Sequence, residues 1–250
     1  MTGPLVSAAW LADHLGEVTV LDASIHRTAT GFAPGREAFA AGHIPSARFA
    51  DLVTDFSDPD APFPFTLPSV ERLRSVALLS GVRNRKRVIV YDRNGGAWAA
   101  RIWWLLRVHG FASVSVLDGG FRAWTGPVET GIPAPLSEVG ELTLHSPSEQ
   151  ATADLDEVAR AEPGTLVCAL RAEQFAAEHI PGSVNVPYLA LLRDDGTIDL
   201  DRARSSAVEA SSIVYCGGGI NAAGLILALV AAGLPAPRLF DGSLNAWRAR

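Results

Sequence analysis

The sequence lacks the features that mark several common classes of protein. Its two cysteines, Cys168 and Cys216, have no paired spacing, so they form neither a disulfide framework nor a zinc site. The longest apolar stretch, 222–234, is about half as long as a membrane span, and no signal peptide is visible at the start. We therefore expect a cytoplasmic protein with reduced thiols and no contact with a membrane.

Positive charge is also scarce. The formal net charge is -6, and Lys86 is the only lysine among 21 basic residues, which argues against a nucleic-acid surface. Hydrophobic residues make up 48% and charged residues 19%, which excludes disorder. A length of 250 residues fits one large domain or two of ordinary size.

What the sequence does contain is a long-period repeat. "RVIVYDRNGGAWAARIWWLLRVHGFASVSVLDGGFRAW" (87–124) is answered by "SSIVYCGGGINAAGLILALVAAGLPAPRLFDGSLNAW" (211–247), and "AGHIPSARF" (41–49) is answered by "AEHIPGSVNVP" (177–187). In this alignment Asp92 stands opposite Cys216. Matching order and spacing predict two duplicated domains, and the period is far too long for a solenoid.

Each half alternates short β-branched runs with helical patterns, which predicts parallel sheets covered by helices on both faces. The expected strands are Val18–Leu21, Val88–Tyr91, Val114–Leu117, Leu166–Cys168, Ile213–Tyr215 and Arg238–Phe240. The fold class is therefore α/β, with a first domain at 1–130, a linker at 131–148 and a second domain at 149–250. A long proline-rich loop, Asp55–Pro68, occurs only in the first half, and we expect it to be functional or interfacial.

The second repeat carries the most informative stretch, "YCGGGINAA". Cys216 follows a predicted strand and precedes a predicted helix that Gly233 ends, so it falls at the carboxyl edge of a parallel sheet, where ligands bind. Three glycines allow backbone N–H groups to form an anion-binding nest, and the helix N-terminus adds partial positive charge. Both features favour a thiolate or a persulfide anion. The same pattern also fits a small buried residue or a phosphate-binding turn, although the turn lacks both a Walker lysine and GxGxxG spacing.

The chain resembles the two-domain rhodaneses, the family of thiosulfate and 3-mercaptopyruvate sulfurtransferases. The motifs that carry this resemblance span nearly the whole chain: "VLDAS", "HIPSARFAD", "VIVYD", "VSVLDGGFRAW", "EHIPGSVNVPY", "YCGGGINAA" and "FDGSLNAW". It implies two rhodanese-like domains, of which the first is catalytically inactive because Asp92 replaces the cysteine. It also implies that no metal or organic cofactor is needed.

The resemblance implies a chemistry as well. Cys216 would take sulfur from a small anionic donor as a persulfide, held by Gly217, Gly218, Gly219, Ile220 and Asn221, and pass it to a thiol, cyanide or a protein cysteine. Related phosphatases need an arginine six positions after the cysteine, where this chain has Ala222. The neutral loop is similar to that of the mercaptopyruvate-type enzymes and lacks the basic residues of the thiosulfate type. The donor can still be either 3-mercaptopyruvate or thiosulfate. Gly218 stands where a hydroxyl residue would help to move a proton.

Further site residues follow from the same resemblance. Arg171 lies one place later than the family's donor-binding arginine, and it is either a donor ligand or a surface residue at a helix start. Arg36 is a second candidate for binding the donor, and it is also expected in the cleft together with Trp98 and Arg101. His43 is either a proton relay or a residue that fixes its turn by a hydrogen bond.

Two alternatives remain open on the sequence alone. Cys168 is either a packed small residue or a redox partner that bridges to Cys216. The protein itself is either a sulfurtransferase acting on small donors or a sulfur-relay module loaded by a protein partner.

Overall fold

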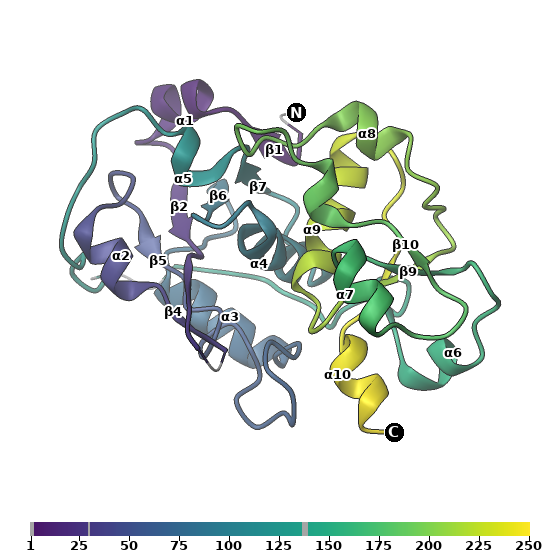
Figure 1. Cartoon of the computed structure of the whole chain (residues 1–250). Coiled ribbons are helices and arrows are strands. Elements are labelled where there is room, and N and C mark those ends of the chain that lie inside the picture. The colour runs from purple at the N-terminus through teal and green to yellow at the C-terminus, as the bar shows by residue number, and fades with distance from the viewer. Residues whose placement is uncertain (1–2, 30, 137–139) are drawn as a thin grey trace.

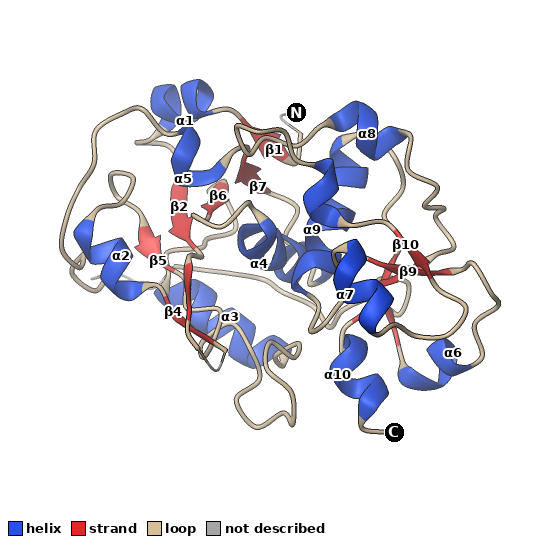
Figure 2. Ribbon diagram, in the orientation of Figure 1, coloured by secondary structure: helices blue, strands red, loops and turns tan. Residues whose placement is uncertain are grey.

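The computed structural model describes residues 3–29, 31–136 and 140–250, and its two halves contain equivalent five-stranded sheets (Figures 1 and 2). The strand order is β1-β7-β6-β2-β5 in the first sheet and β10-β9-β11-β12-β8 in the second. Read from the other edge, the second order becomes β8-β12-β11-β9-β10, which matches the first strand for strand. All neighbouring strands in both sheets are parallel. The predicted α/β fold with duplicated domains is confirmed.

The strands are short, and the central ones are fully buried, as expected for parallel strands covered on both faces. The first sheet consists of β1 (Leu5–Val6), β2 (Thr19–Asp22), β5 (Arg48–Phe49), β6 (Val88–Tyr91) and β7 (Val114–Leu117). The second consists of β8 (Thr152–Ala153), β9 (Leu166–Cys168), β10 (Val184–Asn185), β11 (Ile213–Tyr215) and β12 (Arg238–Phe240). Five of the six predicted strands have the predicted bounds, and β2 is shifted by one residue. A separate antiparallel hairpin, which was not predicted, pairs β3 (Ile25–Arg27) with β4 (Phe32–Pro34).

Helices cover both faces of each sheet. The first half contains α1 (Ala8–His14), α2 (Arg36–Ala41), α3 (Val70–Leu79), α4 (Ala97–Val108) and α5 (Gly120–Ala123). The second contains α6 (Leu155–Ala159), α7 (Ala172–Ala177), the 3₁₀ helix η1 (Tyr188–Leu191), α8 (Leu200–Arg204), α9 (Ile220–Ala231) and α10 (Ser243–Arg248). Helix α9 ends where Gly233 adopts φ +85°, as the sequence predicted.

The largest hydrophobic core lies between the two sheets. Helices α4 and α9, the equivalent helices of the two halves, pack against each other there, and their residues belong to one buried cluster (Figure 1). Two smaller clusters cover the outer faces, one in each half. The two domains therefore share a core, so residues of the first half can contribute to a site in the second.

Among the hydrogen bonds that join the halves, two are related in a nearly symmetrical way. Asp118, after β7, accepts a hydrogen bond from the backbone N–H of Ile198 in the second half at 2.9 Å. Its counterpart Asp241, after β12, accepts one from the N–H of Leu67 in the first half at 2.7 Å. Leu67 belongs to the proline-rich loop 55–68, so this loop is interfacial.

The connecting segment also packs against the first half. Leu142 and Leu144 are buried in the shared core, and the N–H of Asn84 donates to the carbonyl of Glu141. The predicted linker 131–148 includes residues 137–139, which lie outside the described residues. Among the described residues, no helix is both long and apolar enough to cross a bilayer.

Candidate active site

Cys216 directly follows β11, the central strand of the second sheet, and its backbone is fixed from the other side by α10. Its N–H donates to the Ser243 hydroxyl at 3.1 Å, and its carbonyl accepts from the N–H of Leu244 at 3.1 Å. The residue is 2% exposed. The thiol is therefore held at a defined position at the carboxyl edge of the sheet.

The glycine loop turns the chain from this strand into α9. Gly219 adopts φ +83°, a conformation that favours glycine, and α9 begins at the next residue. Among the described residues, the backbone N–H groups from Gly217 to Ala222 donate no hydrogen bond within the protein. A row of free N–H groups at a helix N-terminus beside a thiol is suited to hold an anion on that thiol.

The equivalent loop of the first half shows how such a loop holds an anion. Asp92, after β6, places its carboxylate over the N-terminus of α4 and accepts hydrogen bonds from the N–H groups of Asn94, Gly96, Trp98 and Ala99 at 2.7 to 3.0 Å. Burial raises the pKa of Asp92, while these backbone donors oppose that rise. The first half thus carries a carboxylate of its own in the place where the second half leaves N–H groups free beside a thiol.

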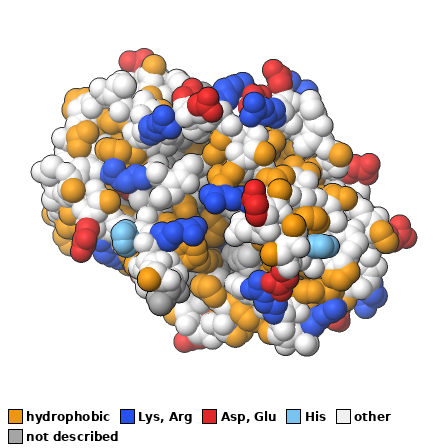
Figure 3. Space-filling view, in the orientation of Figure 1, with side chains coloured by type: hydrophobic (Ala, Val, Ile, Leu, Met, Phe, Trp, Pro, Cys, Tyr) orange, Lys and Arg blue, Asp and Glu red, His pale blue; other side chains and the backbone are white. Residues whose placement is uncertain are grey.

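Cys216 lines a cavity of about 540 Å³ between the two halves. The second half contributes Gly217, Gly218, Ile220 and Asn221 from the loop, so the structure brings together all the predicted loop residues except Gly219. On the face shown in Figure 3, Lys or Arg side chains gather beside the hollow between the halves. Among the described residues, the lining includes two arginines, Arg27 and Arg171, and no carboxylate.

Arg171 reaches this cavity although it lies one residue later than the family pattern. It is the N-cap residue of α7, it is exposed, and no ion pair or hydrogen bond of its side chain occurs among the described residues. The segment that leads to it is anchored by the Asn185 side-chain amide, which donates to the carbonyls of Cys168 and Leu170 at 2.9 and 2.8 Å. A free guanidinium on a fixed segment is suited to bind a carboxylate or sulfonate.

The first half contributes an aromatic wall and the second arginine. Trp98 of α4 packs edge-on against Phe32 and Phe65, with ring centroids 5.0 and 5.2 Å away. Arg27, in the β3–β4 hairpin, lies over the Phe32 ring at 5.3 Å. Sequence reasoning named Trp98 but missed Arg27, Phe32 and Phe65, because nothing in the local pattern predicts that the hairpin and the proline-rich loop meet at the second half's cysteine.

Arg36 does not reach this cavity, which corrects the expectation of a donor-binding role. Its guanidinium pairs with Asp51 at 2.8 Å, lies 3.7 Å from Asp55 and stacks over the Phe49 ring at 4.9 Å. It borders a different cavity from that of Cys216. Its role is to hold the loop that follows β5.

His43 also lies away from the cavity that contains Cys216, and of its two expected roles the structure shows the one that fixes a turn. It is 1% exposed, its Nδ1 lies 2.9 Å from the carbonyl of Phe39, and its ring stacks on the Phe39 ring. His179, its counterpart, has the same contacts with Phe175. Both histidines fix the turn that follows a helix.

Cys168 is a packed residue on the opposite face of the second sheet from Cys216. Cys168 pairs in register with Tyr215, so these two side chains lie on the same face of the sheet. Cys216 follows Tyr215 and therefore points to the opposite face. Cys168 and Cys216 accordingly belong to different hydrophobic clusters, and both are free thiols. This arrangement gives no support to a bridge between them.

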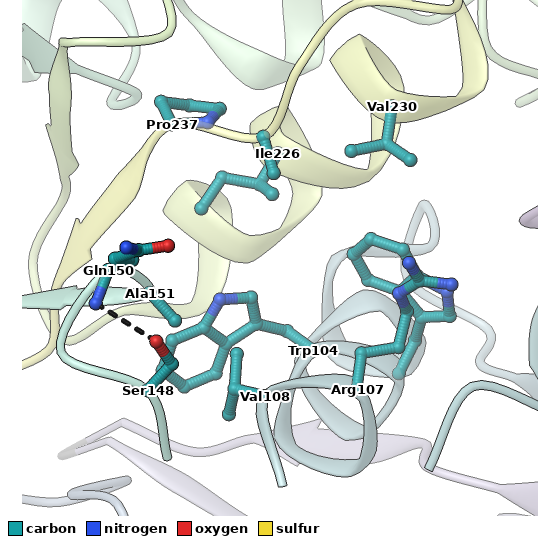
Figure 4. Close-up of a pocket in the computed structure, with 11 residues that line it drawn as sticks. Trp104, Arg107, Val108, Ser148, Gln150, Ala151, Ile226, Val230 and Pro237 are labelled. Atoms are coloured by element: carbon teal, nitrogen blue, oxygen red, sulfur yellow. Dashed lines mark hydrogen bonds between the residues drawn. The ribbon is translucent and has the colours of Figure 1, made fainter. Parts of the chain in front are cut away.

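A smaller cavity of about 300 Å³ lies elsewhere between the halves, lined by side chains of α4, α9 and the segment before β8 (Figure 4). Trp104, Arg107 and Val108 of α4 face Ile226 and Val230 of α9 there. It includes neither cysteine. Over the described part of the chain, no group of His, Cys, Asp and Glu side chains is arranged to hold a metal ion.

Comparison with known proteins agrees with this geometry. The rhodanese-like domain model matches residues 7–127 and 157–250. The chain is 33% identical to the 3-mercaptopyruvate sulfurtransferase of Escherichia coli K12, over 98% of this chain and 95% of that protein. It is 32% identical to the thiosulfate sulfurtransferase of Rattus norvegicus, over 98% of this chain and 92% of that protein.

Solved structures show the same likeness. The crystal structure of SseA, a 3-mercaptopyruvate sulfotransferase from Escherichia coli, matches with a TM-score of 0.80 and 31% identity, covering 97% of this chain and 99% of that one. The 3-mercaptopyruvate sulfurtransferase from Leishmania major matches with a TM-score of 0.82 and 26% identity, over 96% of this chain and 73% of that one. The chain therefore belongs to the rhodanese family, with one rhodanese-like domain in each half.

Proposed function

We propose that this protein is a sulfurtransferase in which Cys216 carries the transferred sulfur as a persulfide. The observation that supports this most directly is the placement of the Cys216 thiol beside the free N–H groups of its loop, at a cavity lined by two arginines that form no ion pair with any described residue. The first domain is inactive in this proposal, since its loop holds the Asp92 carboxylate and offers no thiol. The same proposal assigns residues 1–130 to the inactive first domain and residues 149–250 to the catalytic domain.

The donor that fits the cavity best is a small thiol that carries a carboxylate, such as 3-mercaptopyruvate. Its carboxylate would bind Arg171 or Arg27, while its carbon skeleton packs against the aromatic wall of Phe32, Phe65 and Trp98. The loop from Gly217 to Asn221 has no basic side chain that would favour a compact dianion such as thiosulfate. This chain is similar both to sulfurtransferases named for 3-mercaptopyruvate and to those named for thiosulfate. The preference for 3-mercaptopyruvate therefore rests on the loop and the arginines.

The reaction divides into two transfers. In the first, the Cys216 thiolate attacks the sulfur of 3-mercaptopyruvate, the C–S bond breaks, and the electron pair leaves as the enolate of pyruvate. The donor's thiol loses one proton and the enolate carbon gains one, so the protons balance. Water would carry them, since no His, Asp, Glu or Lys occurs among the described residues that line the cavity. Proton transfer by water would not require the hydroxyl group that Gly218 lacks.

In the second transfer, the acceptor attacks the outer sulfur of the persulfide. The S–S bond breaks and the Cys216 thiolate is restored, while cyanide becomes thiocyanate or an acceptor thiol becomes a persulfide. Between the two steps, the free N–H groups from Gly217 to Ala222 stabilise the outer sulfur anion, as the equivalent N–H groups stabilise the Asp92 carboxylate. No cofactor takes part in either step.

The test is sulfur transfer to cyanide with 3-mercaptopyruvate and with thiosulfate, using Cys216→Ser and, as a matched control, Cys168→Ser. We expect a preference for 3-mercaptopyruvate of more than about tenfold in kcat/KM, complete loss in Cys216→Ser and retention in Cys168→Ser. Equal loss in both variants would refute the assignment of the nucleophile. Turnover of neither donor would favour a relay module that a protein partner loads. The cytoplasmic location also stays a prediction.

A further inference from the structure

Arg101 of α4 is a buried arginine of the first domain that contacts the catalytic half of the molecule. It is 1% exposed. Its Nη2 donates to the carboxylate of Asp241 and to the carbonyl of Phe65, the latter at 2.7 Å. Its guanidinium also lies over the Trp104 ring at 4.8 Å. Burying an arginine is unfavourable unless its charge is paired, and Asp241 supplies that pair here. A buried ion pair between the two halves is weak evidence for stability, so this placement points to a function.

The guanidinium lies directly against the loop that carries Cys216. Nη1 is 2.9 Å from the point where a Cβ on Gly219 would stand. Nη1 and Nε are buried and have no hydrogen-bond partner among the described residues. The third glycine of "CGGG" is therefore needed for two reasons, its φ of +83° and the close approach of Arg101.

The partners of Arg101 connect both sides of the active site. Phe65 belongs to the aromatic wall of the cavity, and Asp241 also accepts the N–H of Leu67, two residues further along the same loop. One guanidinium thus contacts the catalytic loop at Gly219 and binds the loop that forms the donor's wall.

We infer that Arg101 is a positioning residue that sets the Cys216 loop at the correct distance from the aromatic wall, and that the inactive first domain supports catalysis through it. Arg101 does not line the cavity, so it acts on the geometry between nucleophile and donor without touching the donor. This inference rests on the proposed function. A shift of about 1 Å between reacting groups can lower a rate by about 100-fold, so small displacements of either loop should be visible in turnover.

The test compares Arg101→Met and Arg101→Lys with Arg107→Met. Arg107 is the control because it lies on the same helix and contacts a tryptophan ring (that of Trp103), but it is exposed and borders the other cavity. We expect Arg101→Met to lower kcat/KM for 3-mercaptopyruvate by about 10- to 100-fold, with part of the rate restored in Arg101→Lys, which can still pair with Asp241. Arg107→Met should stay within about twofold of the wild type, as for a residue outside the site.

A second measurement, which needs no sulfur transfer, separates this inference from the proposed function. Iodoacetamide reacts with the Cys216 thiol without using the aromatic wall, so its rate in Arg101→Met should stay within about threefold of the wild type, far less than the loss of up to 100-fold in turnover. An equal loss in both reactions would overturn the inference, because Arg101 would then act on the thiol itself. Unchanged turnover in Arg101→Met would overturn it as well. A wild-type protein that transfers no sulfur would defeat the proposed function.

The double variant Arg101→Met/Asp241→Asn covers the case in which the single change unfolds the protein. Removing both charges leaves no uncompensated carboxylate at this partly buried position, so this variant should fold. If Arg101 positions the loops, turnover stays low in the double variant. If Arg101 only neutralises Asp241, turnover recovers to the wild-type level and the inference is wrong.

Discussion

Replacing Asp92 by alanine should destabilise the protein strongly, although Asp92 lies in the domain that carries no thiol. The carboxylate accepts four backbone hydrogen bonds, and two of their donors, the N–H groups of Trp98 and Ala99, lie in the buried first turn of α4. At about 1 kcal/mol for each bond, the variant loses about 4 kcal/mol. Relief from burying a carboxylate, which is itself unfavourable, offsets part of this loss. The expected net decrease in the free energy of unfolding is about 2–4 kcal/mol.

Urea-induced unfolding followed by tryptophan fluorescence measures this change, since the chain contains six tryptophans and Trp98 lies in the affected turn. Asp92→Asn, which keeps one acceptor oxygen, should lose less than Asp92→Ala. Asp195→Ala is the control, because Asp195 is exposed and its side chain, within the described part of the chain, hydrogen-bonds Thr197 alone, so the unfolding midpoint should barely move. A loss below about 1 kcal/mol in Asp92→Ala, no more than a typical single substitution, would refute the view that this loop is built around an anion.

Two further predictions concern the second domain. Arg171→Gln should raise KM for 3-mercaptopyruvate by about tenfold while kcat changes little, because a charge-assisted bond to the donor's carboxylate is lost; steady-state kinetics with this donor would show it. Burial raises the pKa of the Cys168 thiol, so less of it ionises at neutral pH, and iodoacetamide at pH 7.5 should label Cys216 well before Cys168 by peptide mass spectrometry. Labelling of Cys168 first would contradict the packing described for it.

The sequence predicted those parts of the fold that local pattern determines. Apolar β-branched runs gave the central strands β6, β7, β9, β11 and β12 with their observed bounds. The duplication showed that both halves share one topology, and the glycines after Cys216 indicated the turn that leads into α9. These features depend on patterns within the sequence itself, mostly among residues close together in the chain, so a single sequence is sufficient to predict them.

Features that depend on contacts between distant segments were missed or placed wrongly. His43 is a different case: the resemblance suggested a proton relay at the site, but local contacts, a hydrogen bond to Phe39 four residues earlier and stacking on its ring, hold it in the first domain. Arg27 lies in a three-residue strand with no periodic signal, and the hairpin brings it to the cavity. Arg101 sits in an apolar helix, where nothing local indicates that Asp241, 140 residues away, will pair with it.

The division of roles between the halves follows from the structure of the two loops. Each strand–loop–helix unit directs backbone N–H groups at one point, and the first half fills that point with its own carboxylate while the second leaves it free beside a thiol. The cavity at that thiol is nonetheless lined from both halves, with Arg27, Phe65 and Trp98 supplied by the first. In the proposed reaction, the half without a nucleophile therefore has a structural role, because it supplies the aromatic wall against which the donor would pack. An isolated second half would retain the cysteine and its N–H groups but would lack one side of the site in which they act.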